Sequence, residues 1–186
     1  MSSDKTTFIA GVDVGSTTVK IVLADPSDFR IAHRRYERHY AEQADTVLSL
    51  LTEAHQLFPN HEFRLAVCGS GGQKIAEQLG AFYTQEVVSN GIVIRNFFPE
   101  AKTAIELGGQ DAKIIFFSRD EKNGKTSVSD MRMNGVCAGG TGAFIDQIAD
   151  LLKVSAEDFG QLAEHGTRIY EISGRCGVFA KTDIQP

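Results

Sequence analysis

The sequence lacks any uninterrupted apolar run long enough to span a membrane, and its first residues do not lead into the long apolar segment of an export signal. It also lacks an excess of basic charge, because 19 lysines and arginines stand among 24 acidic residues and the net charge is -5. This balance indicates no electropositive face for nucleic acid or anionic lipid. We therefore expect a cytoplasmic protein with no membrane partner and no nucleic-acid partner.

Cysteine is scarce, with Cys68, Cys137 and Cys176 as its three occurrences. An odd number of cysteines in a chain without an export signal favours thiols or metal ligands over a disulfide framework. Cys68 ends a short apolar run over residues 63–68 that predicts a buried strand, so we expect it to be a core residue.

The other two cysteines are each flanked by glycine. Cys137 lies in a glycine-rich turn before an apolar-periodic run over 144–152, near the start of a predicted helix, where the helix dipole stabilises a thiolate or a thiolate-bound cluster. Cys176 has a comparable setting. Because an iron–sulfur cluster usually takes four cysteines, two per chain favour a cluster shared across a symmetric dimer. The alternative is that both are small buried hydrophobic residues.

A β-hairpin is predicted at the start of the chain, with strands over 7–14 and 19–24. Its turn offers N–H and O–H donors to phosphate oxygens, and its carboxylate suits a hydrated Mg²⁺ ion. The alternative is an ordinary polar hairpin. The candidate residues are Asp13, Gly15, Ser16, Thr17 and Lys20.

A second acidic, glycine-rich turn joins predicted strands over 101–107 and 114–118. A third strand over 126–133 and a helix over 141–152 follow it, just as a strand over 29–40 and a helix over 41–57 follow the first hairpin. The chain thus predicts two related lobes, 1–100 and 101–186, whose turns grip the same triphosphate. The candidates in the second turn are Gly108, Gly109, Gln110 and Asp111.

The remaining elements follow from local signals. Residues 69–74 lack the spacing of a P-loop and are interpreted as a strand-to-helix turn before a helix over 73–79. Further helices are predicted over 85–98 and 154–164, the latter capped by Ser155, and short strands or extended segments over 170–172 and 176–180. The helix over 41–57 is expected to bury one face, formed by Val47, Leu50, Leu51, Ala54 and Leu57.

Four stretches, Gly11–Lys20, Ile105–Lys113, Asn134–Asp146 and Cys176–Asp183, together resemble the activase component of 2-hydroxyacyl-CoA dehydratases and benzoyl-CoA reductases. The resemblance implies an α/β fold of the actin-like ATPase (ribonuclease H-like) type, with two related lobes of mixed sheets, the second one incomplete. It also implies a homodimer that uses ATP and Mg²⁺ to deliver an electron to an acyl-CoA dehydratase or reductase. Cys137 and Cys176 of both subunits would ligate one [4Fe–4S] cluster between them.

The same resemblance assigns roles to the two turns. The first-turn candidates would contact phosphates or Mg²⁺ from one side, and the second-turn candidates from the other. Gln110 or Asp111 would position the attacking water, since phosphoryl transfer depends mostly on positioning and charge stabilisation. Glu106 is a further candidate.

Activases continue past the second cysteine with helices and a glycine-rich strand that cradles the adenosine. We therefore expect this chain to be the N-terminal piece of a longer protein. We also expect it to bind ATP weakly or not at all by itself, because a phosphate-binding site without an adenosine pocket loses much of its contact area with the nucleotide.

Two other functions fit parts of the pattern. A small-molecule kinase of the same fold would need a carboxylate base for an acceptor hydroxyl, and every acidic candidate already serves phosphate or metal. A non-enzymatic module would use nucleotide only as a switch. Neither gives the glycine-flanked cysteines a role.

Overall fold

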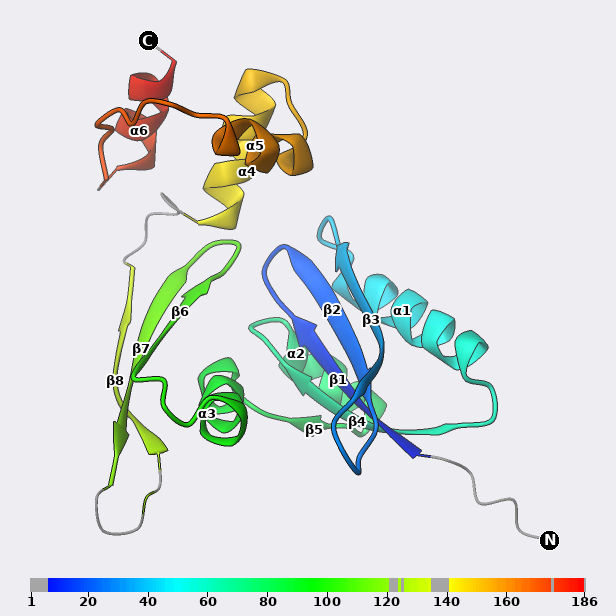
Figure 1. Cartoon of the computed structure of the whole chain (residues 1–186). Helices are drawn as coiled ribbons and strands as arrows, with labels where there is room; N and C mark the ends of the chain where they lie inside the picture. Colours follow the sequence, from blue (N-terminus) through cyan, green and yellow to red (C-terminus); the bar gives the residue numbers. More distant parts are fainter. Residues whose placement is uncertain (1–6, 121–123, 125, 135–140, 175, 186) are drawn as a thin grey trace, which may run out of the picture. The chain divides into compact units, whose positions relative to one another are not determined.

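The computed structural model describes residues 7–120, 124, 126–134, 141–174 and 176–185. The chain divides into two compact units, Met1–Pro99 and Glu100–Pro186 (Figure 1). Cys137 lies outside the described residues, so the predicted placement of this cysteine at a helix start stays a prediction.

The first unit is built on a five-stranded sheet in the order β3-β2-β1-β4-β5. Strands β1, β2 and β3 pair antiparallel, whereas β4 pairs parallel with both β1 and β5, so the sheet is mixed. The strands are β1 (Thr7–Val14), β2 (Thr18–Ala24), β3 (Ile31–Arg38), β4 (Glu62–Cys68) and β5 (Phe82–Tyr83), and the helices are α1 (Gln43–Leu57), α2 (Gly72–Leu79) and α3 (Glu86–Phe97).

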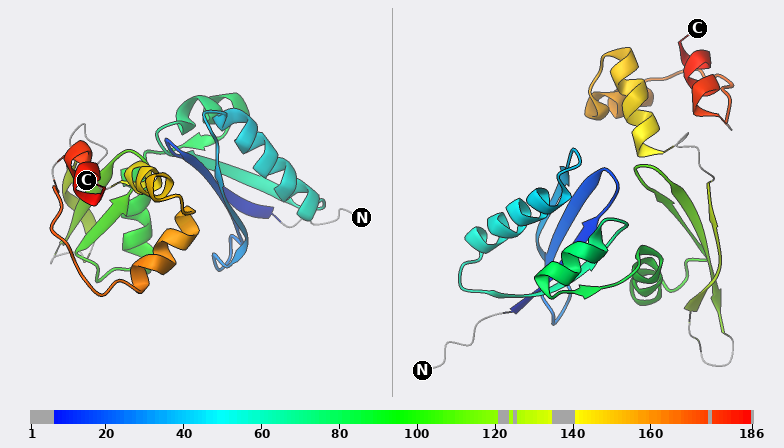
Figure 2. Two further views of the ribbon diagram at one scale, coloured as in Figure 1. Left: turned by 90° about the horizontal axis from the view of Figure 1, so that it is seen from above. Right: turned by 180° about the vertical axis from the view of Figure 1, so that it is seen from behind.

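The core of this unit lies between the sheet and the helices α1 and α2 (Figure 2). Every second residue of β1 is buried, as expected for a strand with one face on the core. Helix α1 buries Val47, Leu50 and Ala54, which the helical period of 3.6 residues places on one stripe. The prediction was wrong for Leu57, which is 54% exposed, because the next residue, Phe58, packs edge-on against Phe8 at that end of the core.

The second unit begins with a three-stranded antiparallel sheet in the order β6-β7-β8. Its middle strand buries Lys113, Ile115 and Phe117 on one face. Helices follow, and the predicted cap is confirmed, because the Ser155 hydroxyl accepts from the Asp158 N–H at 3.0 Å. The elements are β6 (Thr103–Leu107), β7 (Ala112–Arg119), β8 (Thr126–Met133), α4 (Gly142–Leu152), α5 (Ala156–Glu164) and α6 (Gly177–Ile184).

The order of three strands and a helix therefore occurs in both units, as β1-β2-β3-α1 and β6-β7-β8-α4, which confirms that prediction. The prediction of a strand or extended segment over 176–180 was wrong, because these residues cap and begin α6. Valine and phenylalanine favour a strand there, but a strand needs a neighbour to accept its hydrogen bonds, and a helix satisfies them within itself. Within the described ranges, no helix is long and apolar enough to cross a membrane.

Candidate functional site

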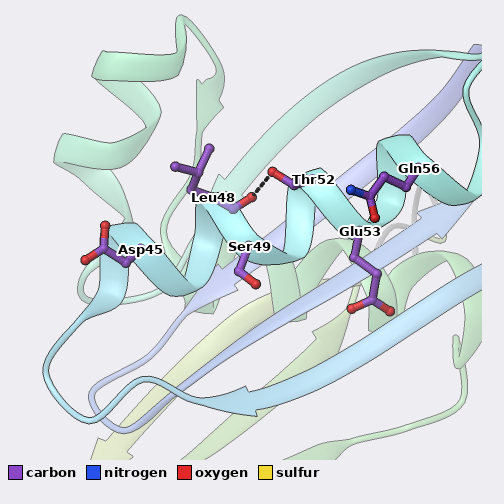
Figure 3. Close-up of a pocket in the computed structure, with 6 residues that line it drawn as sticks. All are labelled: Asp45, Leu48, Ser49, Thr52, Glu53 and Gln56. Atoms are coloured by element: carbon purple, nitrogen blue, oxygen red, sulfur yellow. Dashed lines mark hydrogen bonds between the residues drawn. The ribbon is translucent and has the colours of Figure 1, made fainter.

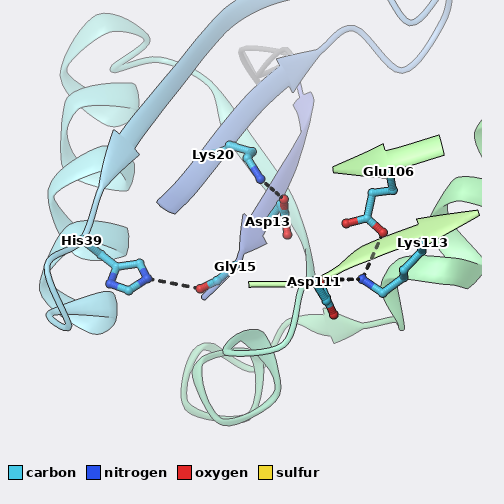
Figure 4. A network of polar contacts seen from close by, with 7 residues as sticks. All are labelled: Asp13, Gly15, Lys20, His39, Glu106, Asp111 and Lys113. Atoms are coloured by element: carbon cyan, nitrogen blue, oxygen red, sulfur yellow. Dashed lines mark hydrogen bonds and ion pairs between the residues drawn. The ribbon is translucent and has the colours of Figure 1, made fainter. Parts of the chain in front are cut away.

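The turn of the first hairpin is closed by its own backbone and by an ion pair across the strands. The Gly15 N–H donates to the Thr18 carbonyl at 2.9 Å, and the strand register places Asp13 opposite Lys20. The Lys20 ammonium donates to Asp13 Oδ2 at 2.7 Å (Figure 4). A lysine and a carboxylate are thereby held at the base of a turn that carries Ser16 and Thr17.

Only one oxygen of the Asp13 carboxylate is used by this ion pair. The other oxygen, Oδ1, is buried and has no hydrogen-bond partner among the residues that the structure describes. Burial by itself lowers the pKa of Lys20, but the hydrogen bond and the charge of Asp13 outweigh it, so the pKa of Lys20 is raised and the ammonium stays charged. The site combines a fixed positive charge with a carboxylate oxygen that has no donor among the described residues.

A second glycine turn packs directly against this carboxylate. Gly69, between β4 and α2, has φ +92°, and a Cβ built on it would overlap the Val14 carbonyl oxygen and lie 2.5 Å from Asp13 Oδ1. The Gly71 N–H donates to the same Val14 carbonyl at 2.9 Å. The turn does lead from a strand into a helix, as predicted. It also supports Asp13, a contact that no local signal indicates because it depends on the parallel pairing of β1 with β4.

The second hairpin reproduces the first in its hydrogen bonds. The Gly108 N–H donates to the Asp111 carbonyl at 2.8 Å, as that of Gly15 does to Thr18, and Glu106 faces Lys113 across the strands as Asp13 faces Lys20. The Lys113 ammonium contacts Glu106 Oε2 at 3.0 Å and Asp111 Oδ1 at 3.3 Å (Figure 4). With 8% of its surface exposed, Lys113 is more deeply buried than Lys20 and holds two carboxylates in place.

Hydrogen bonds also join the second turn to the residues on both sides of the segment that contains Cys137. Before that segment, the Ala112 N–H donates to Asn134 Oδ1 at 2.9 Å, and the Asn134 N–H donates back to the Ala112 carbonyl at 3.0 Å. After it, the first amides of α4, from Gly142 and Ala143, donate to the carbonyls of Gly108 and Gly109 at 2.9 and 2.8 Å. The sequence did not single out Asn134 or Ala143, because neither bond is local in the chain.

The structure groups the predicted residues by turn. The five first-turn candidates lie in the first unit and the four second-turn candidates in the second, where the Gln110 side chain is exposed. Cys176 is half-buried and is the N-cap of α6. In the part of the chain that the structure describes, no group of three or more histidine, cysteine or acidic residues is arranged to hold a metal.

Cys68 is half-buried rather than fully buried. Burial, together with the charge of the adjacent Asp13, raises the pKa of its thiol to about 11. The thiol is therefore protonated at neutral pH, as expected for a cysteine with a packing role.

A hollow of about 420 Å³ follows the outer side of α1 (Figure 3). Its lining residues all come from this helix, whereas ligand sites usually gather polar groups from several elements. We assign it no role. The residues are Asp45, Leu48, Ser49, Thr52, Glu53 and Gln56.

Comparison with known proteins places these features in context. The sequence profile of the BadF/BadG/BcrA/BcrD ATPase family matches residues 10–185. An activator of lactoyl-CoA dehydratase from Anaerotignum propionicum is 38% identical over 178 residues, which are 95% of this chain and 66% of that protein. One of the subunits of benzoyl-CoA reductase from Thauera aromatica is 28% identical over 184 residues, which are 96% of this chain and 62% of that protein.

A solved structure gives the same result in three dimensions. The activator of the 2-hydroxyisocaproyl-CoA dehydratase from Clostridium difficile, with bound ADPNP, superposes with a TM-score of 0.74 and 25% sequence identity. The likeness covers 95% of this chain and 64% of that one. The chain thus spans about two thirds of the length of the proteins it matches.

Proposed function

The chain belongs to the BadF/BadG/BcrA/BcrD ATPase family, and on that premise we propose that it is part of an ATP-dependent activator of an acyl-CoA dehydratase or reductase. Family membership confirms the resemblance that the sequence motifs indicated, and the solved activator structure confirms the actin-like α/β fold. The proteins named as activators of such dehydratases support the role proposed for this chain.

The observation that carries the ATP-binding part of the proposal is the Asp13 carboxylate. One of its oxygens holds Lys20, and the other is buried without a protein donor in the described part of the chain. A buried carboxylate oxygen without a partner is unfavourable, and the water shell of a Mg²⁺ ion would satisfy it. The residues present therefore fit a Mg²⁺ ion bound with phosphates, to which the Lys20 ammonium and the turn of Gly15, Ser16 and Thr17 would add donors.

The second turn would contribute its glycines and the residues that direct water. In the proposal, the backbone at Gly108 and Gly109 approaches the phosphates, and Gln110 and Asp111 position the attacking water. Lys113 supports this assignment, because its two ion pairs fix the Asp111 carboxylate and Glu106. Both turns would be needed for hydrolysis.

The cysteines carry the electron-transfer part of the proposal. Cys176 precedes α6, where its sulfur is near the positive end of the helix dipole, and Cys137 is its proposed companion. Two cysteines from each subunit of a homodimer would hold one [4Fe–4S] cluster, which supplies one-electron transfer when bound. The bonds of Asn134 and of the α4 amides to the second turn support a coupling between nucleotide and cluster, because they tie both flanks of the Cys137 segment to that turn.

Anaerobic reconstitution with iron and sulfide, followed by iron analysis and sizing, tests the proposal. We expect about four irons per dimer, with the iron lost in both Cys137→Ala and Cys176→Ala. Cys68→Ala is the matched control and should keep its iron. A folded wild-type protein that takes up no iron, or equal loss in all three variants, would contradict the cluster.

A further inference from the structure

His39 follows strand β3 and has no part in the proposed function so far. It is 4% exposed, and it lies in the link between β3 and α1. Its ring faces the first phosphate turn (Figure 4). A histidine buried beside a polar turn needs partners for both ring nitrogens, and these partners show what it does.

Hydrogen bonds join the ring and the backbone of His39 to its surroundings. Ring Nε2 lies 3.2 Å from the Gly15 carbonyl oxygen, and the His39 backbone N–H donates to the Thr17 carbonyl at 3.2 Å. The Ala41 N–H donates to ring Nδ1 at 3.0 Å. Because ring Nδ1 accepts a hydrogen bond, the ring proton is on Nε2, which donates a hydrogen bond to the Gly15 carbonyl oxygen.

The backbone after His39 is bent to make the Ala41 contact. Tyr40 and Ala41 have φ angles of 46° and 71°, in the left-handed region that residues with a Cβ rarely adopt. The Glu42 N–H then donates back to the His39 carbonyl at 2.6 Å. Strained residues of this kind persist where the surrounding structure fixes them, and they gather at functional sites.

From this geometry we propose that His39 is a positioning residue for phosphate binding, which orients the first turn by holding the carbonyls of Gly15 and Thr17. The inference rests on the proposed function. Neither the Ser16 nor the Thr17 amide donates a hydrogen bond to another residue that the structure describes. With two carbonyls held on the His39 side, the turn keeps carbonyl oxygens away from a phosphate and leaves these amides available as donors to it.

Two substitutions distinguish the role of ring Nδ1 of His39 from that of ring Nε2. In His39→Asn, the amide oxygen can replace Nδ1 as the acceptor for Ala41, but the side chain is too short to reach Gly15. In His39→Gln, the longer side chain can place its NH₂ group where Nε2 stood and donate to Gly15. His61→Asn is the matched control, because His61 stacks on Phe8 at the opposite end of β1.

Amide hydrogen exchange, measured by NMR on the ligand-free chain, tests whether this contact holds the turn in shape. The Gly15 N–H donates to the Thr18 carbonyl within the turn, and His39 Nε2 bonds to the Gly15 carbonyl. In His39→Asn the turn should open more readily once this carbonyl loses its partner, so we expect the Gly15 amide to exchange about tenfold faster than in the wild type, with Ala41 little changed. In His39→Gln the Ala41 amide should exchange faster, because it has lost Nδ1 as its acceptor, and the Gly15 amide should be little changed. His61→Asn should leave both rates unchanged relative to neighbouring amides. Uniform acceleration in the His39 variants, or an unchanged Gly15 rate in His39→Asn, would overturn the proposal.

Imidazole nitrogen shifts in the wild-type chain give a test that requires no variant. A ring protonated on Nε2 and unprotonated on Nδ1 supports the proposed contacts, whereas the opposite tautomer overturns them.

Titration with Mg·ATP, followed on the Ser16 and Thr17 amides, extends the test to phosphate binding and tolerates weak affinity. The dissociation constant should rise about tenfold in His39→Asn, with little change in His39→Gln. Equal constants in wild type and His39→Asn would overturn the positioning role. If the wild type shows no shift at all, this chain does not bind the nucleotide by itself, in line with the missing adenosine contacts, and the exchange pattern still decides whether His39 orients the turn.

Discussion

Gly69→Ala should destabilise the first unit by about 3–5 kcal/mol. The left-handed backbone at φ +92° costs an alanine about 1–2 kcal/mol. The new Cβ would overlap the Val14 carbonyl oxygen and crowd Asp13 Oδ1, so the first turn must move. Overpacking of this kind and the loss of the Gly71 N–H bond to Val14 add about 2–3 kcal/mol.

Gly80→Ala is the matched control for this prediction. Gly80 also has a positive φ, +61°, but a Cβ built on it would have nothing within 4 Å. This substitution therefore carries the backbone cost alone, about 1–2 kcal/mol. The difference between the two variants isolates the close approach of the glycine turn to Asp13.

Urea unfolding followed by tyrosine fluorescence is a suitable assay. The chain has no tryptophan, and three of its four tyrosines, Tyr36, Tyr40 and Tyr83, lie in the first unit, so the signal reports mainly on that unit. The free energies should be compared at unchanged m-value. Equal destabilisation by Gly69→Ala and Gly80→Ala, within about 0.5 kcal/mol, would refute the reasoning.

Three further predictions concern the ion pairs, the Cys68 thiol and the second turn. Lys113→Met should destabilise its unit by about 1–3 kcal/mol, because it leaves two partly buried carboxylates without their cation. Lys20→Met removes a more exposed ion pair and should cost at most about 1 kcal/mol. Equal losses of unfolding free energy for the two variants in urea would contradict this difference. In a variant without the other two cysteines, Cys68 should react with iodoacetamide about a hundredfold more slowly at pH 8 than an ordinary thiol, because only the thiolate reacts. The reaction rate should rise as the pH approaches the thiol pKa of about 11. Ordinary reactivity at pH 8 would show that the pKa of Cys68 is not raised. Asn134→Ala should lower the free energy of unfolding by about 1–2 kcal/mol, because the Ala112 N–H loses its acceptor. Asn134→Asp keeps a carboxylate oxygen there and should lower it less. The reverse order in thermal unfolding would contradict the reasoning.

Much of the fold was predictable because it follows from local signals. Alternating burial in β1 and the stripe on α1 appear in the sequence as periods of 2 and 3.6, and Ser155 predicts the start of α5 because its cap bond spans three residues. The short connections within the two hairpins and the repeated order of three strands and a helix are likewise local. None of these elements depends, for its prediction, on a contact between residues far apart in the chain.

The sequence failed where a distant neighbour decides the outcome. Cys176 and the residues after it have strand-forming composition, yet they cap and enter α6. Leu57 fits the apolar stripe of α1, yet Phe58 occupies the place against Phe8. Local preference is weak compared with the packing that a residue gains or loses in the folded chain.

The sequence by itself determined which residues form the two turns, because strand, glycine and carboxylate follow one another within a few positions. Only the tertiary structure decided what holds each turn in shape. The parallel pairing of β4 with β1 brings Gly69 against Asp13, and the end of β3 places the His39 ring on Gly15. These contacts join residues far apart in the chain, and their geometry is fixed only when the sheet has formed and the core beneath it is packed.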